Sequence, residues 1–182
     1  MLNSALTQQR YDRMTIALHW IIALIIVLQW AGAHMIDWFP KGSCRVDARS
    51  VHIICGVFLT FALVYRIYWR SAKGVHFSLQ TRSAQERLAK FVHYALYVLL
   101  TVVLGFGIFN TWIRGDDIFG LFHIPKFGAY DALSRHSIAN QIVGWHRLTS
   151  NALLVLGGGH AVVALVHHYL LKDDILRRML PR

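Results

Sequence analysis

The sequence contains few of the residues that a small soluble domain depends on. Of its 182 residues, only 15% are charged, three are proline and two are cysteine. Cys44 follows a polar stretch and Cys55 lies in an apolar run, so we do not expect a disulfide between them. The chain has no C-x-x-C pair, no C-x-x-C-H for covalent haem attachment and no H-E-x-x-H. Any haem would be bound non-covalently, and a zinc-enzyme function is disfavoured.

Acidic residues are also scarce. Nine Asp and Glu against 19 Lys and Arg give a formal charge of +10, which could indicate nucleic-acid binding. The basic residues flank apolar runs instead of forming a stripe with aromatics, however, so anionic lipid is the expected partner and nucleic acid is not. With 55% hydrophobic residues and a mean hydropathy of +0.42, the chain predicts an integral membrane protein.

Four apolar runs are long enough to cross a bilayer. They cover residues of about 14–35, 51–69, 87–111 and 139–171, separated by polar segments with glycine and proline. We therefore predict an all-α bundle of four transmembrane helices in one domain, 1–182. Residues 36–50 and 112–138 are expected to be loops.

The Lys and Arg residues predict the orientation. Twelve of them lie on the side that carries both chain ends and seven on the other, which places both termini in the cytoplasm. Ala31-Gly32-Ala33 resembles a signal-peptidase site, but the run before it is longer than a usual signal sequence and contains His19 and Trp20. We expect this run to remain as the first span.

The fourth run carries two histidines that set the interpretation of the others. His146 and His160 are 14 residues apart, so they share a helix face and are separated by roughly 21 Å along the axis. With alternating helix directions, His52 lies at the depth of His146, and His19 lies at the depth of His160. His93 also starts a span near the depth of His19, so depth alone leaves it as an alternative ligand.

Two single ligands on facing helices suit a flat haem better than a zinc ion, which prefers a tight tetrahedral cluster. Gly56 lies one turn after His52, where a porphyrin can approach the backbone. Arg66 is 14 residues after His52, at the cytoplasmic end of the same face, where it could bind a haem propionate or reach lipid phosphate.

Several stretches resemble the bacterial cytochrome b561 family, including its superoxide oxidase members. The matching residues are IALHW around His19, SVHIICG around His52, GWHRL around His146, and GGHAVVALVHHY followed by KDDILRRMLP at the end. The resemblance covers all four spans. It implies a bacterial inner-membrane protein with two b-type haems, whose axial ligands would be His19 with His160 and His52 with His146.

The resemblance also implies an activity. The two haems would transfer electrons from superoxide on the periplasmic side to ubiquinone. A basic outer surface would steer the superoxide anion; its cations are Lys41, Arg45, Arg49, Lys126, Arg135 and Arg147. For quinone we favour His167, two turns after His160, with His93 as a further candidate. Individual outer cations could equally be ordinary solvated residues.

Two other functions stay open at this point. The chain could be a plain electron-transfer subunit, exchanging electrons between quinol and another redox partner, or a haem-free transport or structural bundle. A homodimer is one arrangement the sequence allows. The remaining histidines are expected at the surface; they are His34, His76, His123, His136 and His168.

Overall fold

A computed structural model of the chain describes residues 10–73 and 84–181. Four long helices form the bundle: α1 (Arg13–Met35), α2 (Ser43–Ala72), α3 (Ala84–Arg114) and α4 (Ala132–Tyr169). The shorter elements are the 3₁₀ turns η1 (Ile36–Trp38) and η2 (Arg177–Met179), and the strands β1 (Asp117–Ile118) and β2 (Phe122–His123). All four helices are long and apolar enough to cross a membrane, which confirms the predicted fold class of four transmembrane helices. His76, which we expected at the surface, lies outside the described residues.

Two predicted boundaries were wrong. The second helix begins at Ser43 instead of near Val51, and the fourth begins at Ala132 instead of near 139. Hydropathy marks where a helix enters the lipid, whereas polar residues can continue the same helix into water. Asp131 caps α4 by accepting a hydrogen bond from the Ser134 amide.

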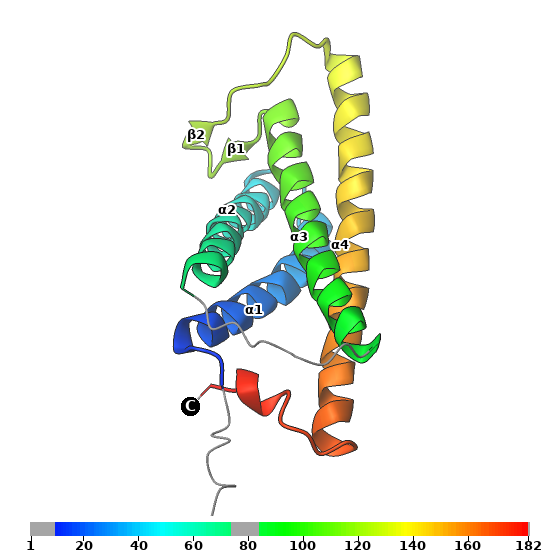
Figure 1. Ribbon diagram of the computed structural model, residues 1–182. Helices are drawn as coiled ribbons and strands as arrows, with labels where there is room; N and C mark the ends of the chain where they lie inside the picture. Colours follow the sequence, from blue (N-terminus) through cyan, green and yellow to red (C-terminus); the bar gives the residue numbers. More distant parts are fainter. Residues whose placement is uncertain (1–9, 74–83, 182) are drawn as a thin grey trace, which may run out of the picture.

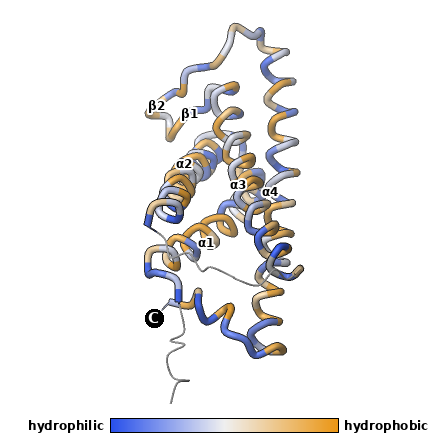
Figure 2. Tube along the Cα trace, viewed as in Figure 1, coloured by the Kyte–Doolittle hydropathy of each residue, from blue (hydrophilic) through white to orange (hydrophobic). Residues whose placement is uncertain are grey.

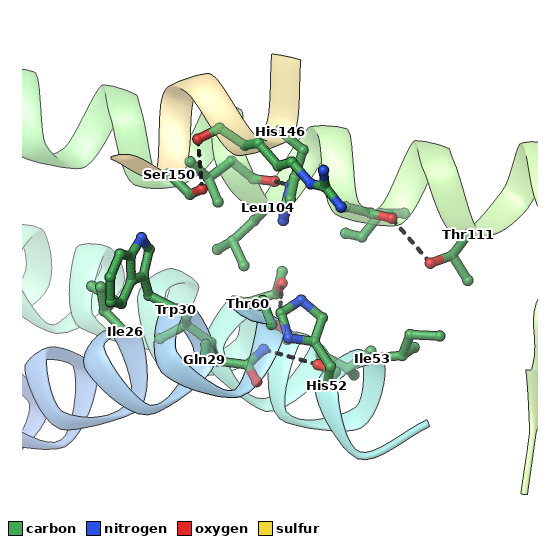
Figure 3. A pocket seen from close by; sticks show the side chains of 18 of the residues that line it. Ile26, Gln29, Trp30, His52, Ile53, Thr60, Leu104, Thr111, His146 and Ser150 are labelled. Atoms are coloured by element: carbon green, nitrogen blue, oxygen red, sulfur yellow. Dashed lines mark hydrogen bonds between the residues drawn. The ribbon is translucent and has the colours of Figure 1, made fainter. Parts of the chain in front are cut away.

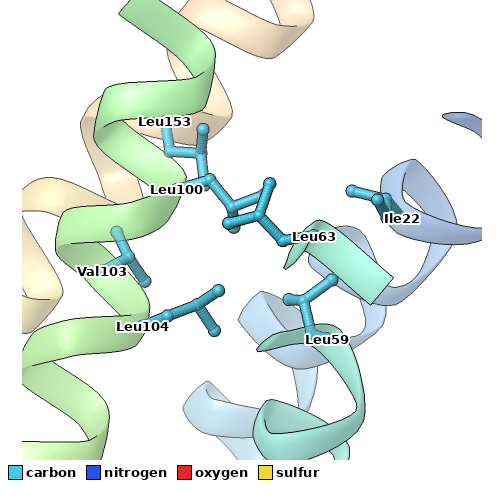
Figure 4. Packing of buried hydrophobic residues seen from close by; sticks show 7 residues of the cluster. All are labelled: Ile22, Leu59, Leu63, Leu100, Val103, Leu104 and Leu153. Carbon is cyan, nitrogen blue, oxygen red and sulfur yellow. The ribbon is translucent and has the colours of Figure 1, made fainter. Parts of the chain in front are cut away.

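The buried core is small and draws on all four helices (Figure 4). Its members are Ile22, Leu59, Leu63, Leu100, Val103, Leu104 and Leu153. Large apolar side chains also cover the outside, including Leu24 at 60% and Val155 at 76% exposure. Figure 2 shows α1 coloured mainly as hydrophobic along its length. Lipid rather than protein covers such surfaces in a membrane helix, so a small internal core is sufficient.

The first and the last described residues lie at the same end of the bundle, which we call the inner end. The Tyr11 amide donates a hydrogen bond to the Arg178 carbonyl over 3.4 Å. The β1–β2 hairpin lies at the opposite, outer end (Figure 1). The sequence predicts that the inner end faces the cytoplasm.

The outer hairpin is attached to α2 through Ser50, which is fully buried. Its hydroxyl lies 3.2 Å from the Asp117 carbonyl and accepts a hydrogen bond from the Phe119 amide. We expected residues 112–138 to form only an irregular loop. Two-residue strands are too short to leave a readable alternation, and the contact that fixes them comes from another helix.

Arg135 fixes the remainder of the outer loop. Its guanidinium donates hydrogen bonds to the carbonyls of Ile113, Phe127, Gly128 and Tyr130 at 2.9–3.2 Å. Arg135 thus joins the end of α3 to the start of α4. We expected Arg135 to be one of the superoxide-steering cations. In the structure its terminal N–H groups bind backbone carbonyls instead.

We expect Arg135→Ala to open the outer loop. Losing hydrogen bonds from a charged donor costs about 2 kcal/mol, which corresponds to more than a tenfold rise in the open population. Limited proteolysis of residues 115–131 in purified protein measures this opening. Arg147→Ala, another cation on α4, serves as the control and should leave the cleavage rate unchanged. Equal cleavage of Arg135→Ala and wild type would show that the loop does not depend on this residue.

Candidate dihistidine haem sites

A cavity of about 420 Å³ opens between the helices in the outer half of the bundle. His52 from α2 and His146 from α4 both line it (Figure 3). Gly56, one turn after His52, lines the same cavity. Most of the other lining side chains are apolar, among them Ile26, Ile53, Leu100 and Leu104. The predicted outer histidines therefore meet across a largely apolar space.

The separation of this pair fits a metal between the rings. The centroids of the His52 and His146 rings are 6.3 Å apart. Two metal to imidazole bonds of about 2 Å, plus the distance from each nitrogen to its ring centre, require about the same separation. His52 Nδ1 is buried and makes no hydrogen bond within the described part of the chain. An imidazole in this setting needs a ligand or partner.

Helix α3 orients His146, a role that the sequence analysis did not predict. His146 Nδ1 lies 2.9 Å from the Val103 carbonyl, which can only accept a hydrogen bond. The hydrogen is therefore on Nδ1, and Nε2 keeps the lone pair that a metal needs. A Cβ added at Gly107 would lie 3.3 Å from His146 Cε1, so glycine leaves room for the ring.

The inner pair has nearly the same spacing. The ring centroids of His19 on α1 and His160 on α4 are 6.4 Å apart. His93 on α3 is nearer to His160, at 5.1 Å, which is too short for two imidazoles on opposite sides of one metal. His93 is also exposed, and its Nδ1 lies 2.6 Å from the Ala89 carbonyl. The measured spacing favours His19 over His93 as the partner of His160.

Arg66 projects into the inner site, near the position where the sequence placed it. Its Nε donates to the Tyr97 hydroxyl over 2.8 Å, and one terminal nitrogen lies 3.3 Å from His19 Nδ1. A guanidinium can only donate, so this contact leaves the ring hydrogen of a neutral His19 on Nε2. Binding a metal through Nε2 would release this end of Arg66 and make it available to a carboxylate.

His167 pairs with a residue that the sequence analysis did not single out. Its Nδ1 lies 2.5 Å from Asp173 Oδ2, just beyond the end of α4. Burial opposes the ionisation of Asp173, but hydrogen bonds from His167 and the Ile175 amide outweigh it and lower the pKa of this carboxyl. The neighbouring His168 is half-buried, packs edge-on to Tyr169 and has a buried Nδ1 without a hydrogen bond in the described structure.

Three of the predicted steering cations form ion pairs with one of two carboxylates, Asp37 or Asp116. Arg45 and Arg147 lie 3.8 and 3.6 Å from Asp37, whose backbone carbonyl Arg45 also binds. Arg49 lies 3.5 Å from the buried Asp116. Lys41 and Lys126 are exposed and form no ion pair or hydrogen bond with any described residue. The outer surface is therefore less positive than the residue count implies.

Asp116 also binds Arg114, at 3.3 Å, at the end of α3. Burial raises the pKa of the Asp116 carboxyl, while Arg114 and Arg49 act in the opposite direction. This cluster connects α2, α3 and the hairpin, which is a structural role. The histidines predicted at the surface have local partners: His34 contacts the Trp30 carbonyl, His123 contacts Asp117, and His136 contacts Asn140.

The residues present fit a haem held by two imidazoles better than a metal cluster. Over residues 10–73 and 84–181, no group of three or more His, Cys, Asp or Glu side chains could hold a metal ion. Cys44 and Cys55 are free thiols, as expected. The outer pair lines a cavity of about 420 Å³ whose lining is mostly apolar, which suits the apolar faces of a porphyrin.

Comparison with known proteins also indicates a haem-binding protein. The family model described as prokaryotic cytochrome b561 matches residues 10–182. Cytochrome b561 homolog 2 of Escherichia coli is 32% identical over 178 residues, which is 96% of this chain and 93% of that protein. A Yersinia pestis protein named "Probable superoxide oxidase CybB" is 26% identical over 96% of this chain and 97% of its own length. Cytochrome b562 of Cereibacter sphaeroides is 28% identical over 93% of this chain and 94% of that protein.

The family match covers all four spans and both histidine pairs, and the relatives share nearly the whole chain. The chain therefore belongs to the prokaryotic cytochrome b561 family of electron-transfer proteins that bind b-type haem, and it is a multi-pass protein of the bacterial inner membrane.

Proposed function

We propose that the protein holds two b haems and transfers electrons from superoxide at the outer surface to a quinone near the inner end. The main support is the match between two ring separations, 6.3 Å for His52 and His146 and 6.4 Å for His19 and His160. His146 and His160 lie on one helix, roughly 21 Å apart along its axis. One histidine pair in each half of the membrane is the arrangement that electron transfer across the membrane requires.

The ligand sets determine what chemistry is available. Haem held by these histidines would supply reversible one-electron transfer, and with both imidazoles of a pair bound to it the metal would not be open to substrate. His146 is held by the Val103 carbonyl, and His52 lies on the opposite wall of the cavity. Arg66, anchored on Tyr97, would bind a propionate carboxylate at the inner site.

At the outer end, exposed cations would attract superoxide before electron transfer. Two superoxide anions would each lose one electron and leave as O₂. Lys41 and Lys126 are the best candidates for steering, because Arg45, Arg49 and Arg147 each have a carboxylate partner. The name of the Yersinia pestis relative supports superoxide as the donor.

At the inner end, a quinone such as ubiquinone would take up those two electrons and two protons to form quinol. His167 would donate a proton to a quinone oxygen, because Asp173 binds its Nδ1 and leaves Nε2 for the substrate. His93 is a second candidate, since its Nδ1 is bound to the Ala89 carbonyl and the ring is exposed.

A plain electron-transfer role is the second candidate function. The observation that favours it is the pairing of Arg45 and Arg147 with Asp37, which weakens the outer positive field. In this case quinol and another membrane or periplasmic redox protein would be the partners. Bilayer lipid surrounds the bundle in either case, and a homodimer remains a proposal.

We expect pyridine haemochrome quantitation to give two haems per wild-type chain. His52→Ala and His160→Ala should each lose about one haem, because each removes half of one ligand pair. His19→Ala should match His160→Ala, whereas His93→Ala should retain both haems. A His93→Ala protein that loses a haem while His19→Ala keeps two would reverse the inner assignment.

The double variant Lys41→Gln/Lys126→Gln tests whether these two lysines attract superoxide. We expect haem reduction by superoxide in stopped-flow mixing to slow about two- to fivefold and to depend less on salt, because two exposed cations are lost. Lys90→Gln, an exposed cation at the inner end of α3, is the control. No reduction of the wild-type haem by superoxide, with normal reduction by a quinol analogue, would select the plain electron-transfer role.

His167→Gln should slow oxidation of the reduced haems by a soluble ubiquinone analogue by about 100-fold, the usual contribution of a positioned proton donor. His168→Gln is the matched control and should react at the wild-type rate. Rapid single-turnover absorbance measurements follow the reaction. Unchanged oxidation in His167→Gln, with slow oxidation in His93→Ala, would move the proton donor to α3.

A further inference from the structure

The chain turns sharply after α4 and returns beneath the bundle. Lys172 has a left-handed φ of 54°, and the Asp173 amide donates a hydrogen bond to the His167 carbonyl over 3.1 Å. Figure 1 shows the tail, in red, running from the base of α4 toward the start of α1. Met179 of the KDDILRRMLP motif thus contacts Trp20, which lies 159 residues earlier in the sequence.

The tail reaches α1 through backbone carbonyls. Trp20 Nε1 donates a hydrogen bond to the Met179 carbonyl over 2.6 Å. Beside it, the Tyr11 amide donates to the Arg178 carbonyl over 3.4 Å. The 3₁₀ turn η2 includes Met179, whose amide bonds back to the Leu176 carbonyl over 2.9 Å, so the accepting segment is itself structured.

Trp20 connects this contact to the inner histidine pair. Its ring packs edge-on against the His19 ring, with centroids 5.5 Å apart and an interplanar angle of 74°. His19 in turn faces His160 at 6.4 Å. A continuous series of contacts therefore runs from the Met179 carbonyl through the indole to the imidazole.

The inner pair needs such a connection because its two helices pack mainly on other partners. Helix α1 packs chiefly against α2, and α4 chiefly against α3. The Trp30 indole binds Asn151 over 2.8 Å and joins α1 to α4 in the region of the outer cavity that both residues line. The tail makes the corresponding connection at the inner end.

We infer that the C-terminal tail positions His19 through Trp20, so that the last residues of the chain complete the inner haem site. The inference rests on the proposed dihaem function. Trp20 is a positioning residue here, because it touches the ligand ring and its indole N–H is fixed by the tail. The outer pair, supported by Val103 and Gly107 on α3, is independent of the tail.

Trp20→Phe tests this inference, since it keeps an aromatic ring and removes only the N–H and part of the ring. Transfer of haem from the purified protein to apomyoglobin measures the rate of haem loss from each site. The kinetic phase that is missing in His160→Ala is the one that belongs to the inner haem. We expect loss of the inner haem to accelerate about three- to tenfold, the usual effect of one hydrogen bond, with loss of the outer haem unchanged. Trp38→Phe, at an exposed position in η1, is the control.

Inserting two glycines after Asp174 shifts the tail against Trp20 while keeping the full chain. This variant should accelerate inner haem loss to a similar extent, and combining it with Trp20→Phe should add little, because both changes interrupt the same series of contacts. Two haems with wild-type loss rates in Trp20→Phe would overturn the role of the tail alone. Fewer than two haems in the wild type would overturn the proposed dihaem function itself.

Discussion

An imidazole inside a bilayer has no water to bind its ring nitrogens, and this constraint underlies the arrangement of the helices. Histidines at such depths need a specific partner. The bundle meets this need by placing His52 opposite His146 and His19 opposite His160. The Val103 carbonyl and Gly107 on α3 then orient His146, while the Arg66 and Trp20 side chains contact His19. The buried core can stay small because the faces away from these pairs are covered by lipid.

The two sites are supported in different ways, and the difference matches the directions that electrons and protons would take. The outer pair lines a largely apolar cavity, and α3 orients His146 through the Val103 carbonyl. The inner pair has polar and titratable neighbours, with Arg66 beside His19 and His93 beside His160. A site that only passes electrons can be apolar, whereas a site next to proton uptake requires groups that bind and release protons.

Much of the architecture could be predicted because hydropathy and histidine spacing are local signals. The four spans and the depth of each histidine pair could be predicted from these signals, and so could the position of Arg66 near the inner pair. The beginnings of α2 and α4 could not be predicted, because polar residues continue a helix beyond the lipid. The contacts of Val103 and Met179 could not be predicted, because both residues accept hydrogen bonds through backbone carbonyls and every residue type has one. Asp37 reduces the expected outer charge because it pairs with Arg147 from another helix.

A cryo-electron microscopy structure of the haem-loaded protein tests the central claim most directly. The account predicts two irons, one bound by nitrogens of His52 and His146 and the other by nitrogens of His19 and His160, each bond about 2 Å long. A single iron, or an inner iron bound by His93 in place of His19, would contradict it.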